Sequence, residues 1–443
     1  MAETYDLLFQ GATIVNQDGA GLADIGVKDG RIAAIGPLGK AKAAETMDVT
    51  GLHILPGVID TQVHFREPGL EHKEDLQTGS ASAVLGGVTA VFEMPNTKPA
   101  TTSAAALADK VSRATGRMYC DFAFFVGATA DNSGALAELE RLPGAAGVKL
   151  FMGSSTGDLL VDDEATLARI LAAISRRAAF HAEDEARLKE RLFHQREGDP
   201  SSHSEWRDPQ AALQATELLL RLAREAGKRV HVLHVSTAEE MALLARHKDI
   251  ASVEVTPQHL TLAAPEAYAA LGTRAQMNPP IRDRVHQEKL WWGLKQGVVD
   301  VLGSDHAPHT LEEKAKAYPA TPSGMPGVQT LVPVMLDHVN AGRLSLARFV
   351  DLTSAGPQRL FGIAGKGRIA VGYDADFTIV DLKAKRVIED TWIGSKCGWT
   401  PFAGRKVTGW PVGAIVRGRR AMWEGALGEP GGAPVRFGEA LAK

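Results

Sequence analysis

The sequence predicts an α/β fold, a (β/α)8 TIM-like barrel joined to a small β-sandwich domain built from both termini. Eight apolar, β-rich runs recur along the middle of the 443-residue chain, and each precedes an amphipathic stretch rich in Ala, Leu, Glu, Lys and Arg. Runs that alternate with helical stretches favour a parallel sheet covered by helices, and eight units over roughly 250 residues suit a barrel. Both ends of the chain instead contain short β segments separated by turn residues.

The expected elements follow in chain order. Residues 1–54 contain short strands with frequent turns, as in DLLFQGATIVN and GVKDGRIAAIG. Residues 55–363 carry the eight runs: GVIDTQVHF, GVTAVFEM, CDFAFFVGA, GVKLFM, RAAFHAED, RVHVLHVS, ASVEVTP and VDVLGSDHAP. Residues 364–443 return to β segments, in GRIAVGYDADFTIVDL and KVTGWPVGAIVRGRRAMW. We therefore expect a barrel over 55–363 and a β domain formed by the two flanking segments.

The composition is that of an ordinary globular protein. With 23% charged residues and a net charge of −4, it gives no reason to expect binding to nucleic acid or to an anionic membrane. The two cysteines, Cys120 and Cys397, cannot make a disulfide framework. We expect no signal peptide, and no run approaches the roughly 18 apolar residues of a membrane span. These features predict a cytoplasmic globular protein.

Polar side chains stand late in several of the eight runs. They are His64, Arg66, Asn96, Lys149, His181, His234 and Asp305. The carboxyl ends of barrel strands meet at one end of the barrel, where active sites lie. One histidine at a strand end is more often structural than a ligand, but histidines and a carboxylate together are the ligands of Zn²⁺ and similar ions. The joint occurrence predicts a metal site.

Three assignments at these strand ends have two interpretations each. In HVLHVS only one of His231 and His234 should face the barrel mouth, and we choose the later His234. Asp305 either binds a metal and relays a proton or caps a helix that begins near HTLEEKAK. Lys149 either reaches a carboxylate at the rim or, with its pKa depressed by burial, takes up CO₂ as a carbamate that bridges two cations. For Lys149, the sequence alone does not decide between the two interpretations.

Other polar residues indicate how a substrate would be held. Arg66 is a planar cation suited to a two-point grip on a carboxylate. Asn96 and Asn278 carry amides that can meet both the donors and the acceptors of a ring imide. The Gly- and Pro-rich segment 323–330, SGMPGVQT, either presents backbone groups to a small ligand or is a plain connection.

In their order, these motifs resemble the amidohydrolase superfamily and, within it, the class I dihydroorotases. They are QVHFREPG, MPNT, GVKLF, FHAED, HVST, TPQHL, NPPIR and GSDHAPH, and the similarity covers nearly the whole chain. It implies a hydrolase that interconverts N-carbamoyl-L-aspartate and (S)-dihydroorotate in pyrimidine biosynthesis. Hydantoinases, dihydropyrimidinases and allantoinases share the scaffold and remain the alternative.

The resemblance also implies roles for single residues. The ligands of one or two Zn²⁺ ions would be His64, carboxylated Lys149, His181, His234 and Asp305. Asp305 would also move the proton. The residues that hold dihydroorotate would be Arg66, Asn96, Asn278 and His309, with Arg66 and His309 at its carboxylate. A homo-oligomer is expected from the family.

Two residues depart from the family pattern. Gln62 stands where the H-x-H pair has its first histidine, and Gln258 replaces the first histidine of T-P-H-H-L. An amide oxygen is a poorer Zn²⁺ ligand than an imidazole. Gln62 therefore leaves three possibilities: a weak ligand, a site with one metal, or an inactive homologue that scaffolds aspartate transcarbamoylase. Retention of the other five ligands argues against full decay.

Overall fold

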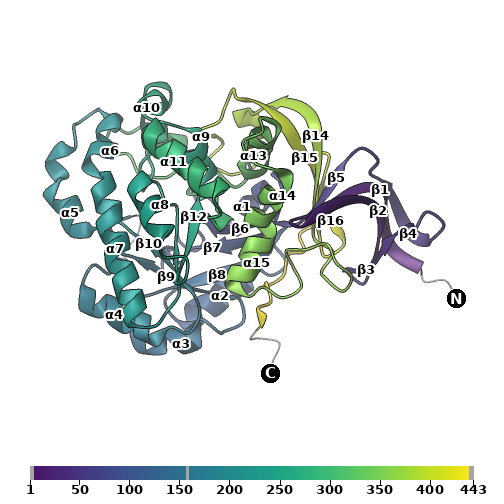
Figure 1. Cartoon of the computed structure of the whole chain (residues 1–443), viewed down its shortest axis with the longest axis horizontal. Helices are drawn as coiled ribbons and strands as arrows, with labels where there is room; N and C mark the ends of the chain where they lie inside the picture. Colours follow the sequence, from purple (N-terminus) through teal and green to yellow (C-terminus); the bar gives the residue numbers. More distant parts are fainter. Residues whose placement is uncertain (1–3, 156–158, 439–443) are drawn as a thin grey trace.

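The computed structural model describes residues 4–155 and 159–438, and its centre is an eight-stranded parallel sheet (Figure 1). The strands follow in chain order: β6 (Val58–Val63), β7 (Val88–Glu93), β8 (Asp121–Gly127), β9 (Ala145–Phe151), β10 (Ala178–His181), β11 (Val230–Val232), β12 (Ala251–Val255) and β13 (Val301–Leu302). Seven of the predicted runs contain one of these strands, and the eighth, GVKLFM, overlaps β9, which begins two residues earlier. A parallel bridge between Val63 and His306 joins the two ends of the sheet. The predicted barrel is confirmed.

Helices separate successive strands and cover the barrel. They are α1 (Leu76–Leu85), α2 (Ala104–Ala114), α3 (Leu136–Leu139), α4 (Glu164–Ala173), α5 (Glu185–Glu190), α6 (His203–Trp206), α7 (Pro209–Glu225), α8 (Ala238–Leu244), α9 (Pro257–Thr261), α10 (Glu266–Leu271), α11 (Arg284–Lys295), α12 (Leu311–Lys314), α13 (Leu331–Asn340), α14 (Leu346–Val350) and α15 (Gly356–Phe361). In α7, the Asp208 side chain caps the first turn and Pro209 starts the helix. Leu219 and Ala223 lie on its buried face, the amphipathic pattern that the sequence predicts.

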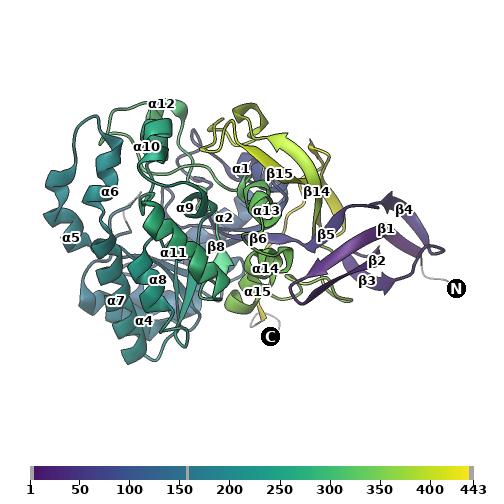
Figure 2. The same cartoon turned by 45° about the horizontal axis from the view of Figure 1, so that its top comes forward.

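The two ends of the chain form a second, nine-stranded sheet. Its strands are β1 (Thr4–Asn16), β2 (Gly19–Lys28), β3 (Arg31–Gly36), β4 (Lys42–Asp48), β5 (His53–Pro56), β14 (Phe377–Val387), β15 (Lys406–Val416), β16 (Arg419–Trp423) and β17 (Ala426–Leu427). Antiparallel pairing of β5 with β14, as in Ile54 opposite Ile379, joins the two terminal segments. This confirms a β domain built from both termini. Strands β1–β4 lie on the side of the barrel away from α4–α7 (Figure 2).

A buried ion network ties the β domain to the barrel. Lys366 donates to Asp121 Oδ2 at the start of β8, over 2.5 Å, and to Asp376 just before β14. Lys366 is 3% exposed, and its charge compensates carboxylates that would otherwise be buried at high cost. Among the described helices, none is long and apolar enough to cross a membrane.

Candidate active site

A small cavity lies at the carboxyl ends of the barrel strands. Nine of the ten sequence-predicted site residues line it: Gln62, His64, Arg66, Asn96, Lys149, His181, His234, Asn278 and Asp305. The tenth, His309, contacts Arg66 beside it. The free volume is about 20 Å³, room for about one water molecule. A ring-shaped substrate therefore requires the surrounding side chains or loops to move apart.

The backbone is unusual at three of the cavity residues. Arg66, His234 and Asp305 have φ values of 67°, 37° and 44°, in the left-handed region that non-glycine residues rarely occupy. Strained backbone of this kind concentrates at functional sites. Strand β6 ends at Val63, so Arg66 lies beyond the end of the strand. Arg66 reaches the cavity through its left-handed turn.

One pair of candidate ligands is His64 and Asp305. His64 Nδ1 lies 2.8 Å from Asn96 Oδ1, so this nitrogen donates to the amide. In a neutral ring the lone pair is then on Nε2, which faces Asp305 Oδ1 at 3.3 Å. Burial alone would raise the pKa of Asp305, but the nearby His64, His234 and Lys149 hold it below the ordinary value. A cation would satisfy both atoms.

The second pair is His181 and His234. His181 Nε2 contacts Glu183 Oε2 at 2.9 Å, and Glu183 also accepts from Arg207. His181 Nδ1 lies 3.0 Å from His234 Nε2. Within the described part of the chain, His234 Nδ1 has no hydrogen-bond partner. A histidine whose far nitrogen donates to a carboxylate is the usual arrangement of a metal ligand.

Lys149 lies among these four side chains. Burial lowers its pKa to about 7, against the opposing effect of Asp305 and Glu254. Its Nζ is 4.4 Å from the centre of the Phe151 ring and, in residues 4–155 and 159–438, has no hydrogen-bond partner. The rim-carboxylate interpretation is therefore wrong. A buried amine that is partly neutral at pH 7 has the chemistry that carbamate formation needs.

The donor chemistry fits a divalent metal ion. Imidazoles, a carboxylate and an uncommitted amine face one another, and two of the imidazoles are oriented by a second partner. The two pairs do not yet surround one point, since no group of three His, Cys, Asp or Glu in the described residues is placed to hold a metal ion. A lysine amine does not count among these donors. Lys149 would add a further metal ligand to the two pairs only as a carbamate, which resembles a carboxylate.

The structure also decides the other two open interpretations. Thr310 caps α12, so the helix-cap interpretation of Asp305 is wrong. His234 lines the cavity, whereas His231 points into the barrel interior and pairs with Ser252 Oγ at 2.8 Å.

The opposite side of the cavity carries a buried cation. Arg66 is 1% exposed, and its Nε donates to the Pro308 carbonyl oxygen at 3.2 Å. Its Nη2 lies 3.4 Å from His309 Nε2. No carboxylate of the described residues forms an ion pair with it, and burial lowers its pKa to about 10, so it stays charged at pH 7. A buried guanidinium beside a cavity and without a paired carboxylate suits an anionic ligand.

The two asparagines line the cavity, whereas Gln258, the second residue that departs from the family pattern, lies outside it. Asn96 and Asn278 both line the cavity, and Asn278 Oδ1 accepts from His203 Nε2 at 2.8 Å. Gln258 is outside the cavity lining, and its Nε2 donates to the Ser304 carbonyl oxygen at 2.7 Å. The replacement at 258 therefore supports the backbone before Asp305 rather than the cavity itself.

Sequence reasoning missed several residues at this site. Glu183 orients His181, and its only signal was its place in the FHAED motif. Phe151 and Ser155 line the cavity. Lys73 contacts His309, and nothing in the sequence around it indicates that contact. The segment 323–330 does reach the cavity, through Ser323 and Gly324.

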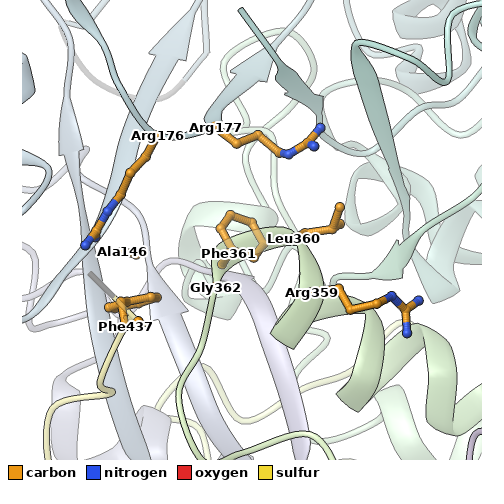
Figure 3. A pocket seen from close by; sticks show the side chains of 9 residues that line it. Ala146, Arg176, Arg177, Arg359, Leu360, Phe361, Gly362 and Phe437 are labelled. Carbon is orange, nitrogen blue, oxygen red and sulfur yellow. The ribbon is translucent and has the colours of Figure 1, made fainter. Parts of the chain in front are cut away.

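A larger cavity, of about 390 Å³, lies at the amino ends of the barrel strands (Figure 3). Three arginines line it: Arg176, Arg177 and Arg359. In Figure 3 Arg176 points away from Arg177 and Arg359, and each guanidinium already donates to a protein oxygen. The larger cavity contains no predicted site residue, so the smaller one is the candidate active site.

Comparisons with known proteins agree with this geometry. Residues 53–421 match the model of the Amidohydrolase family. The chain is 36% identical to a dihydroorotase of Methanothermobacter thermautotrophicus over 418 residues. This alignment covers 92% of this chain and 93% of that protein. A dihydroorotase of Halobacterium salinarum is 38% identical over 84% of this chain and 86% of its own length. The solved L-hydantoinase (dihydropyrimidinase) of Arthrobacter aurescens has a TM-score of 0.92 at 32% identity, with 97% of this chain and 99% of that chain covered.

Proposed function

Because the chain belongs to the amidohydrolase family, we propose that it is a dihydroorotase, which interconverts N-carbamoyl-L-aspartate and (S)-dihydroorotate in pyrimidine biosynthesis. The observation that carries this proposal is Arg66, a buried guanidinium that faces the cavity without a carboxylate partner among the described residues. Dihydroorotate has a ring carboxylate that this cation can bind in two-point fashion. The similarity to two dihydroorotases over more than four fifths of the chain supports the same choice.

The proposed cofactor is Zn²⁺, one or two ions per chain. His64, Lys149 as its carbamate, His181, His234 and Asp305 would hold the metal, with Gln62 as a weak or lost ligand position. A bound Zn²⁺ would act as a Lewis acid on the ring carbonyl and lower the pKa of water towards ~7. The lone pairs that face each other in the His64–Asp305 pair support this assignment.

The remaining steps belong to the side chains of the chain itself. Arg66 and His309 would bind the carboxylate, and Asn96 and Asn278 would bind the imide edge of the ring. Asp305 would take up a proton on ring opening and return it to the departing ring nitrogen; ring closure runs in reverse. Its lowered pKa keeps Asp305 ionised at pH 7, ready to accept that proton. The small closed cavity would keep bulk water out.

Two other functions have a specific observation in their favour. The similarity to an L-hydantoinase supports a hydantoinase-type cyclic amidase, but simple hydantoins lack the carboxylate that Arg66 would bind. Gln62 supports a catalytically inactive protein that scaffolds aspartate transcarbamoylase. A scaffold requires neither bound metal nor a free guanidinium in a cavity, and so it leaves the arrangement around Arg66 without a purpose.

Purified, zinc-loaded protein tests the three functions together. We expect ring opening of dihydroorotate, with much slower turnover of hydantoin and allantoin, and one or two Zn²⁺ per chain by elemental analysis. Turnover of hydantoin without turnover of dihydroorotate would assign the hydantoinase function. Absence of metal and of turnover, with co-purification of aspartate transcarbamoylase, would assign the scaffold.

The assembly and the domain limits are proposed as well. We propose a homo-oligomer, by analogy with the family, and a cytoplasmic location stays a prediction from the sequence. For the domains we keep 1–54, 55–363 and 364–443. Pairing of β5 with β14 extends as far as Pro56, and β6 begins at Val58, which supports a first limit in this short connection.

A further inference from the structure

His309 lies in a buried polar contact beside the cavity. Its Nδ1 is 3.2 Å from Lys73 Nζ. On the other side of the ring, Nε2 is 3.0 Å from the Ser323 carbonyl oxygen and 3.4 Å from Arg66 Nη2. The imidazole therefore lies between two cations and one carbonyl oxygen, and Glu313 Oε2 is 3.6 Å from Nδ1.

These neighbours select one tautomer of His309. Lys73 also pairs with Glu313 Oε1 at 3.0 Å, and its side chain is 11% exposed. An ammonium group only donates hydrogen bonds, and Lys73 Nζ is closer to Nδ1 than Glu313 Oε2 is, so Nδ1 is the accepting nitrogen. Burial and the surrounding cations hold the pKa of His309 at about 3, although Glu313 opposes them. A ring that is neutral and accepts at Nδ1 carries its hydrogen on Nε2.

The carbonyl that receives this hydrogen is itself held in place. Lys314 donates to the Pro322 and Gly324 carbonyl oxygens, at 2.8 and 3.1 Å, which flank Ser323 on both sides. The Ser323 carbonyl oxygen is thereby fixed in front of Nε2. Arg66 then faces an N–H of His309 rather than a lone pair, so His309 does not consume a donor of the guanidinium. The guanidinium thereby keeps its donors for the cavity, whereas the one N–H of His309 is bound to the Ser323 carbonyl oxygen.

We propose that Lys73 is a positioning residue that holds His309 in the Nε2–H tautomer, so that His309 takes no donor of Arg66 and the guanidinium keeps its donors for the carboxylate of the substrate. The inference deepens the proposed function and rests on it for the identity of the anion. A purely structural role is the competing interpretation, since the Lys73–Glu313 pair also joins the segment before α1 to α12. The tautomer of His309 distinguishes the two roles, because a structural pair does not require either form.

The first test observes the tautomer directly. Zinc-loaded protein with ¹⁵N-labelled histidine is studied by NMR, and a His309→Asn variant assigns the signals of His309. We expect an unprotonated Nδ1 and a protonated Nε2 in the wild type, and a population with protonated Nδ1 in Lys73→Met. The matched control is Lys396→Met, because Lys396 pairs with Asp75 and with the Glu71 carbonyl oxygen in the same region of the fold. It should leave the signals of His309 unchanged.

The second test separates positioning from folding by kinetics. Lys73→Met should raise KM for dihydroorotate about tenfold with kcat within about twofold, and Lys73→Arg should recover most of the loss. KM for dihydrouracil, the same ring without a carboxylate, should not change. A protonated Nδ1 in the wild type, an unchanged tautomer in Lys73→Met, or equal KM changes for both rings would overturn the role of Lys73. If no variant acts on dihydroorotate, the proposed function fails, whereas the NMR result still decides the tautomer.

Discussion

Gln62 donates from Nε2 to Asp305 Oδ1 over 3.1 Å, the same oxygen that faces His64 Nε2 at 3.3 Å. The family motif has a histidine at this position. The amide nitrogen of Gln62 has no lone pair for a metal, and its Oε1 is buried without a hydrogen-bond partner among the described residues. Gln62 therefore engages Asp305 where a ligand would engage the cation.

Gln62→His should strengthen metal binding at least about tenfold, because it replaces an amide by an imidazole beside His64 and Asp305. The measurement is a competition titration of Zn²⁺ against a chelator, together with metal content per chain. Gln258→His is the matched control, since Gln258 bonds to the Ser304 carbonyl oxygen outside the cavity. An equal effect of both substitutions, or none at position 62, would show that Gln62 does not limit the site.

Arg66→Met should raise KM for dihydroorotate by about 100-fold, because a charge-assisted pair contributes about 1.5–3 kcal/mol. KM for dihydrouracil, which has no carboxylate, should change little. Steady-state kinetics on both rings provide the comparison. Equal losses on the two rings would mean that Arg66 supports the cavity rather than binding an anion.

The lowered pKa of Lys149 should make the stability of the metal-free protein depend on pH. Its pKa is about 7 in the folded chain and about 10.4 when exposed in the unfolded chain. Between these values the unfolded chain binds more protons, so the free energy of unfolding rises with pH, by up to about 1.4 kcal/mol per pH unit. Lys149→Met removes this dependence, and the variant should be more stable than the wild type near pH 8.

Urea unfolding of both proteins at several pH values, without metal and without CO₂, measures this effect. The stability difference should shrink as the pH approaches about 10. A difference that does not vary with pH would contradict a depressed pKa for Lys149.

Lys366→Met should lower the free energy of unfolding by about 3–5 kcal/mol, because it leaves the buried carboxylate of Asp376 without its cation, while Asp121 keeps Arg417. Asp121 and Asp376 both accept from Lys366, and all three are at most 6% exposed. Arg368→Met is the control, since its pair with Asp18 is solvent-exposed and should contribute little to stability. Similar losses for both variants, in urea or thermal unfolding, would contradict the importance of burial here.

The barrel was predictable because its signal is local. Each strand run is apolar and each following helix has its own period, so order and type could be read along the chain. Strand limits were harder: β13 is only two residues long, and its run differs little from a loop. The pairing of β5 with β14 joins residues more than 300 positions apart, as in Ile54 with Ile379, and only the shared texture of the two ends pointed to it.

Those residues of the candidate site that lie at or near the ends of strands could be predicted from the sequence. His64, Lys149, His181, His234 and Asp305 fall at one end of the barrel because parallel strands share that end. The contacts that orient them could not be read in this way. Glu183 and Lys73 act through partners that the sequence does not place near them in any regular pattern, and the left-handed backbone of Arg66 depends on packing around the whole cavity.

The central claim is that the site depends on a metal ion and binds the carboxylate of its substrate. Ring opening of dihydroorotate by purified zinc-loaded protein tests this claim most directly. The predicted result is turnover at about 1 s⁻¹ or faster, lost on removal of zinc by a chelator and restored by its return. Protein that holds zinc and still leaves dihydroorotate intact would contradict the claim.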